Sequence, residues 1–177
     1  MSHSFSGKWI TTNRVTNFEL YLDRTDRLSE EEYILEHHQD LLPDWILPPK
    51  SIVFVFFQCQ IPLDGSNLSQ EDLEKQRSWQ MACELGEVFR QCCQEQNVMS
   101  EVICPKTGYP LYSRRGSKSF HLSALITRFL RSFRGDDHPC NVIHPQWQKA
   151  VYPSLMLSSG SKSEMEIIIE RTLQQIL

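Results

Sequence analysis

The sequence predicts an α+β fold in which helices flank a layered, mixed β-sheet. Segments of strand character alternate with segments of helical periodicity, and two neighbouring strands near the C-terminal end predict a hairpin. The clearest strand is SIVFVFFQCQ, which begins at Ser51 and is rich in β-branched and aromatic residues with little alternation. We therefore expect it near the centre of the sheet, covered on both faces.

The N-terminal residues differ in composition from the rest of the chain. Residues 1–15 contain several Ser and Thr, two basic residues and no acidic residue. We expect them to form a flexible leader in front of one α+β domain over residues 16–177, because a chain of 177 residues suits a single domain. The leader has a faint similarity to a mitochondrial presequence.

Capping boxes predict where three helices begin. In this motif a Ser or Thr side chain and an acidic side chain three residues later bind the first free backbone amides of a helix. Ser29–Glu32, Ser69–Asp72 and Ser163–Glu166 have this spacing. They predict a short helix to about residue 42, a long helix to about residue 96 and a terminal helix. The long helix carries an apolar stripe at three- and four-residue spacing, made of Ala82, Leu85, Val88, Phe89 and Cys92.

The remaining elements follow from alternation and from chain breakers. NFELYLD alternates apolar with polar residues, which indicates a half-buried strand. PKTG supplies a turn after the strand VMSEVIC, and Gly135 is the expected stop of a helix that starts near Ser119. The elements expected in this way are strands over 17–23, 98–104, 109–113, 141–144 and 149–158, and a helix over 119–134.

Charge and hydropathy argue against two classes of partner. The net charge is −4, and the densest basic segment holds only Arg114, Arg115 and Lys118, so we expect no nucleic acid. No apolar run approaches the roughly 20 residues of a membrane-spanning helix, so we expect no membrane. These features favour the cytoplasm, with mitochondria as the alternative.

Six cysteines occur without a CxxC pair, and most are expected to be small buried residues in a reducing compartment. Of the adjacent pair Cys92–Cys93, at most one is expected in the apolar stripe, because neighbours on a helix point about 100° apart. Cys92 fits the stripe. Cys104 is expected to pack at the end of its strand.

The segment GDDHPCNVIHPQW places Cys140 between His138 and His144. Pro139 stiffens the approach to the thiol, and a neighbouring imidazolium lowers the pKa of a thiol. A thiolate is both a nucleophile and a soft ligand for late transition metals. The alternative is that Cys140 packs inward while both histidines face solvent. A zinc site from these three side chains is disfavoured because no fourth ligand is visible.

The second half of the chain resembles the CblD family of cobalamin-trafficking proteins, the family of the methylmalonic aciduria and homocystinuria type D protein. The likeness begins at EVFRQCCQEQNV, continues through EVICPKTGYPLYS and is clearest in GDDHPCNVIHPQWQKAVYPSLMLSSGSKSE. There an acidic pair, a thiol, a Val–Ile step, a tryptophan and an apolar strand follow one another. Family members carry two adjacent cysteines in this loop, whereas here Pro139 precedes the single Cys140.

This resemblance implies a nitroreductase-like domain that acts as an adaptor or chaperone rather than as an enzyme. It implies a CblC-type cobalamin-processing partner and delivery of vitamin B12 towards B12-dependent enzymes. In the family a cysteine thiolate of this loop coordinates the cobalt of cobalamin held by the partner, and Cys140 matches it as the metal ligand. The expected cobalamin-contacting residues are Cys140, His138, His144 and Trp147.

Two other functions stay open at this point. The first is a flavin-dependent, nitroreductase-type oxidoreductase that holds the phosphate of FMN with Arg114, Arg115 and Lys118. The second is a protein-interaction module unrelated to B12, which uses an exposed sheet edge or the loop LPDWILPP, where Trp45 is the candidate anchor for a partner. The alternative for Trp45 is that it folds back over the core.

Overall fold

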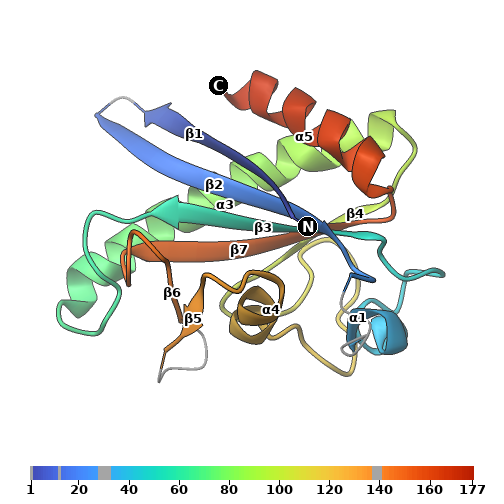
Figure 1. The fold of residues 1–177 in the computed structure, drawn as a ribbon, viewed down its shortest axis with the longest axis horizontal. Coiled ribbons are helices and arrows are strands. Elements are labelled where there is room, and N and C mark those ends of the chain that lie inside the picture. The colour runs from blue at the N-terminus through green and yellow to red at the C-terminus, as the bar shows by residue number, and fades with distance from the viewer. Residues whose placement is uncertain (1, 12, 28–32, 137–140) are drawn as a thin grey trace.

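A five-stranded antiparallel sheet with the order β1-β2-β3-β7-β4 forms the middle layer of the fold (Figure 1). The computed structural model describes residues 2–11, 13–27, 33–136 and 141–177. The strands of this sheet are β1 (His3–Thr11), β2 (Arg14–Arg24), β3 (Ser51–Gln58), β4 (Ser100–Ile103) and β7 (Val151–Ser158). The layered α+β class predicted from the sequence is confirmed.

Each pair of neighbouring strands in this sheet is antiparallel, whereas the sequence predicts a mixed sheet. The reason lies in the position of β7. Strands β3 and β4 run parallel to each other and are connected through the long helix α3 (Leu68–Glu95), but β7 lies between them and is antiparallel to both. The chain therefore makes a crossover between two parallel strands, β3 and β4, that are not hydrogen-bonded to each other.

Helices cover the two faces of the sheet unequally (Figure 1). Helices α3 and α5 (Lys162–Ile176) lie on one face. The other face carries α1 (Tyr33–Glu36), α2 (His38–Leu41), α4 (Leu122–Phe129) and the small two-stranded sheet of β5 (Arg134–Gly135) and β6 (Val142–Ile143).

The central strand β3 divides its side chains between two hydrophobic cores. Ile52, Phe54 and Phe56 pack in the core under α4, and Val53, Val55 and Phe57 pack in the core under α3 and α5. All six are at most 1% exposed, which confirms that this strand is covered on both faces. Side chains alternate between the faces of a strand, so a continuous apolar run can fill both cores.

Most of the segment expected to be a flexible leader is part of the sheet. Strand β1 pairs with β2 from His3↔Leu22 to Thr11↔Arg14. Trp9 is 7% exposed and makes edge contacts with the rings of Phe18 and Phe57. The domain therefore includes the segment assigned to the leader, because cross-strand aromatic contacts fix it to the sheet.

Two helix starts differ from the predicted ones. The N-cap of α3 is Asn67, whose side chain accepts a hydrogen bond from the amide of Gln70. The capping box of α5 is Ser161 with Glu164. The segment SKSEME contains the capping-box spacing twice, two residues apart, so local pattern alone could not choose between them. The predicted box at residues 29 and 32 lies outside the described residues.

The segment after α4 also differs from expectation. The helix ends at Phe129, and Phe133 reaches the core through a turn in which its amide donates to the carbonyl of Leu130. Gly135, the predicted helix stop, lies in β5 and pairs with Val142. Strand β6 thus pairs with β5 and not with β7, and only a single bridge between His144 and Gln148 remains of the predicted hairpin.

Candidate functional site

The loop that carries Cys140 is closed at its base by β5 and β6. The pairs Arg134↔Ile143 and Gly135↔Val142 hold the two ends of the connection from residue 136 to residue 141. Cys140 and His138 belong to this connection and lie outside the described residues, so the structure does not report on their side chains. The structure does describe the surroundings of Asp136 and Asn141, the residues at the two ends of this connection.

Both ends of this connection lie at a cavity of about 650 Å³. Asp136 and Asn141 contribute to its lining together with side chains from α3 and from the start of β7. Cys104, the first residue after β4, lines the same cavity and is half-buried. The predicted thiol therefore directly precedes, in the chain, a residue that lines this cavity.

His144 is a structural residue of the neighbouring turn. Its side chain is 1% exposed, its Nδ1 accepts hydrogen bonds from the amides of Gln146 and Trp147, and its Nε2 lies 3.1 Å from Oε1 of Glu19. Because Nδ1 is an acceptor, Nε2 carries the proton and donates it to Glu19. Burial lowers the pKa of His144, against the opposing effect of Glu19. Both ring nitrogens are thus engaged within the protein.

Trp147 stacks on the imidazole of His144, with ring centroids 4.0 Å apart and an angle of 6° between the planes. The expectation that both residues contact cobalamin stays a prediction. His144 packs inside the turn and does not face solvent, whereas Trp147 keeps a partly exposed surface. The two residues are close in the chain, whereas Glu19, the hydrogen-bond partner of His144, lies on the distant strand β2.

A second, smaller hollow of about 250 Å³ lies beside this turn. Glu19, Tyr21 and His144 line it, and the hydroxyl of Tyr21 donates to Oε2 of Glu19. Sequence reasoning missed Glu19 and Tyr21. Their spacing of two in a strand, which puts them on one face, was the available signal.

Three of the other cysteines, Cys59, Cys92 and Cys93, are buried. Cys92 and Cys93 are both fully buried, so the prediction that only Cys92 belongs to the apolar face is wrong. Helix α3 is covered by the sheet and by α5: Cys92 lies 3.5 Å from Nε2 of Gln175, whereas Cys93 interacts with the hydroxyls of Ser158 and Ser100. Burial raises the pKa of Cys93 to about 12 and that of Cys59 to about 11.

The basic segment expected to hold a flavin phosphate is bound to the domain itself. Arg114 contacts Asp44 through its amide and its Nε, and Nζ of Lys118 lies 3.7 Å from the carboxylate of Asp40. The guanidinium of Arg115 lies over the ring of Tyr109. These contacts direct the three cations to different partners, so they do not converge on a common anion.

Trp45 is 2% exposed and packs in the core under α4. The prediction that it anchors a partner is wrong, and the alternative that it folds back over the core is confirmed. The following residues Ile46 and Leu47 are exposed instead. The amide of Trp45 donates a hydrogen bond to the carbonyl of Leu42, which forms a turn at this point of the loop. Burial of the large apolar indole ring in the core stabilises this arrangement.

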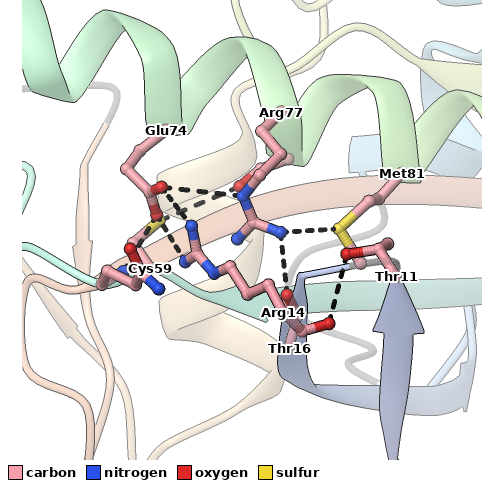
Figure 2. A network of polar contacts seen from close by, with 9 residues as sticks. Thr11, Arg14, Thr16, Cys59, Glu74, Arg77 and Met81 are labelled. Atoms are coloured by element: carbon pink, nitrogen blue, oxygen red, sulfur yellow. Dashed lines mark hydrogen bonds and ion pairs between the residues drawn. The ribbon is translucent and has the colours of Figure 1, made fainter.

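A network between β2 and α3 is the second site that sequence reasoning missed. Figure 2 shows the guanidinium of Arg14 facing the carboxylate of Glu74, with two hydrogen bonds of 2.5 and 2.8 Å. The amide of Gln60 donates to the same carboxylate, and Arg77 donates to the hydroxyl of Thr16. Arg14 is the first cause that lowers the pKa of Glu74, to about 2. The network joins the start of β2 to the helix.

No protein-family model and no curated protein matches the chain. In the described parts of the chain, no three or more His, Cys, Asp and Glu side chains are grouped so as to hold a metal ion. Within the same residues, no helix combines the length and apolar character needed to cross a membrane.

Proposed function

We propose that this protein is a cobalamin-trafficking adaptor, without a catalytic set of its own, that offers the thiolate of Cys140 to the cobalt of cobalamin held by a CblC-type partner. The observation that carries the proposal is the closed loop between β5 and β6. Its ends, Asp136 and Asn141, both line the large cavity. Together with the resemblance to the CblD family, this supports a thiol carried at a hollow of the surface.

The chemistry of the proposal requires one soft donor on this chain. A thiolate is a suitable axial ligand for a late transition metal such as cobalt, and the partner supplies the pocket for the corrin. A loop that is held at both ends by a strand pair loses less conformational freedom on docking than an open chain does. The β5–β6 pair therefore lowers the cost of presenting the ligand.

The other thiols are less suited to this role. Cys59, Cys92 and Cys93 are buried, and burial holds the pKa of Cys59 and Cys93 far above neutrality. A buried neutral thiol neither reaches a partner nor binds a metal as thiolate. Cys104 is the half-buried thiol of the cavity and serves as the natural control.

The proposal places the hand-over of cobalamin in the cytoplasm, upstream of B12-dependent enzymes. An FMN-dependent oxidoreductase has less support, because Arg114, Arg115 and Lys118 are directed to separate partners within the domain. Burial of Trp45 removes the loop anchor proposed for an interaction module unrelated to B12, and leaves only the sheet-edge version of that hypothesis.

The test is a visible spectrum of cob(II)alamin with the CblC-type partner, recorded with and without this protein. We expect a shift of the absorption bands with the wild-type chain and with Cys104→Ser, and no shift with Cys140→Ser. An unchanged spectrum with the wild-type chain, or the same shift with Cys140→Ser, would exclude the thiolate ligand.

A further inference from the structure

The cavity of about 650 Å³ lies at the end of the sheet, where β7 begins. One wall comes from the N-terminal half of α3, and another from the segment that follows β4. Its volume falls within the roughly 300–1,000 Å³ typical of small-molecule sites. A cavity of this size is large enough to enclose most of a ligand with two or three rings.

Two aromatic side chains on different elements contribute to the walls. Trp79 comes from α3 and Tyr152 from β7, and both also pack partly against the core under α3 and α5. Val151 and Pro153 extend this apolar lining along the strand. Aromatic and aliphatic walls of this kind bury flat, apolar ring systems well.

The charged groups at the cavity are three lysines and two aspartates, although the chain as a whole carries a net charge of −4. Lys149 pairs with Asp136, with 3.4 Å between Nζ and Oδ1. Lys75 and Lys106 line the cavity from different segments, and neither makes an ion pair or hydrogen bond with any residue that the structure describes. Asp72 is the other acid of the lining, so the cavity keeps an excess of one positive charge.

We infer that this cavity binds a planar, mainly apolar molecule that carries one anionic group, such as an aromatic carboxylate or sulfonate. The rings lie between Trp79 and Tyr152, and the anion lies near the ammonium groups of Lys75 and Lys106. Attraction between the anion and these ammonium groups is stronger at the edge of an apolar cavity than in bulk water. The inference does not depend on cobalamin, on a partner or on Cys140.

The experiment compares two probes of equal shape, naphthalene-2-sulfonate and the neutral naphthalene-2-sulfonamide, by calorimetric titration into the protein of residues 1–177. We expect one site that binds the sulfonate about tenfold more tightly than the sulfonamide, a difference set by one charge. In the double variant Lys75→Ala with Lys106→Ala, this preference should disappear. The matched double variant Lys8→Ala with Lys50→Ala removes two exposed lysines that do not line the cavity and should keep it.

Alkylation of Cys104 locates the bound probe independently of affinity. Cys104 lines the cavity, so the sulfonate should slow its reaction with iodoacetamide in the wild-type chain, as measured by mass spectrometry of the cysteine-containing peptides. Equal affinity for the two probes would overturn the inference. Sulfonate binding that leaves the alkylation rate of Cys104 unchanged would overturn it as well.

Discussion

The imidazole of His144 donates a hydrogen bond to the carboxylate of Glu19, with 3.1 Å between Nε2 and Oε1, across 125 residues of sequence. The other ring nitrogen accepts two backbone amides, so the neutral ring with its proton on Nε2 is the form that fits the turn. This bond fastens the turn that follows the Cys140 loop to the second strand of the sheet. The loop that carries the proposed ligand is therefore braced from β2.

Stability should fall as the pH drops below the ordinary pKa of histidine. Burial lowers the pKa of His144 in the folded protein below its ordinary value of 6.5, and Glu19 is the ionisable group that faces it. The unfolded chain then binds this proton at higher pH than the folded chain does, so stability is full above about pH 6.5 and is lost as the pH falls from there towards the lowered pKa.

The measurement is urea unfolding of the wild-type chain and of His144→Gln between pH 8 and pH 5. At pH 8 the substitution should cost about 1–3 kcal/mol, because it leaves buried hydrogen-bonding groups without a partner. The pH dependence should be weaker in the variant than in the wild type. Parallel curves for the two chains would contradict the role given to His144.

Removing the carboxylate of Glu74 should destabilise the protein strongly. Arg14 makes a bidentate contact with it, and the two side chains are 15% and 11% exposed, so Glu74→Gln leaves a largely buried guanidinium without its counter-charge. We expect a loss of about 3 kcal/mol in the free energy of unfolding at pH 7. Glu95→Gln is the control, since its pair with Arg171 is exposed and long at 3.9 Å, and it should cost less than about 0.5 kcal/mol.

Protonation of Glu74 should cause a second loss of stability, at lower pH than the one expected from His144. The folded pKa of Glu74 is about 2, against 4.5 for the free group, so its contribution is present above pH 4.5 and is lost as the pH falls towards 2. Circular dichroism during acid titration should show this transition in the wild-type chain. If Glu74→Gln lost structure over the same pH range and by the same amount, the network would not be its cause.

Glycine 116 should not tolerate a side chain. A Cβ at Gly116 would lie 1.7 Å from the carbonyl oxygen of Asp40, because the basic segment runs closely over α2. Gly116→Ala should lower the free energy of unfolding by about 1–3 kcal/mol through forced separation of the two segments. Gly135→Ala is the matched control, since no atom of the residues that the structure describes lies within 4 Å of its added Cβ, and thermal denaturation of the two variants would compare them.

Thiol labelling should follow burial. Cys83 and Cys104 are half-buried, whereas Cys59, Cys92 and Cys93 are at most 4% exposed. We expect iodoacetamide to modify the first two well before the other three at pH 7.5, because access and thiolate content both limit the reaction. Simultaneous labelling of all five, read from peptide masses, would mean that the packing of α3 against the sheet and α5 is not as described.

Local composition and periodicity were enough to predict several elements. The run from Ile52 to Phe57 has the character of a strand buried on both faces, and the apolar stripe of α3 has helical spacing, so both were predicted close to their bounds. Strand β1 was missed because its partners are mostly supplied by β2. Its alternating Ser, Gly and Lys residues carry little apolar signal of their own.

The candidate site was likewise predicted only in part from the sequence. Composition identified Cys140 as a thiol next to a proline and two histidines, because those neighbours are adjacent in the chain. It could not show that pairing of β5 with β6 closes the loop, that His144 forms a hydrogen bond with Glu19, or that Lys75 and Lys106 line the same cavity. The His144–Glu19 contact and the cavity that Lys75 and Lys106 both line join residues far apart in sequence. Strands β5 and β6 are close in the chain, but their pairing takes Gly135 out of the predicted helix. Periodicity reports which face of an element is apolar, whereas strand order and loop placement depend on how all the faces are buried at once.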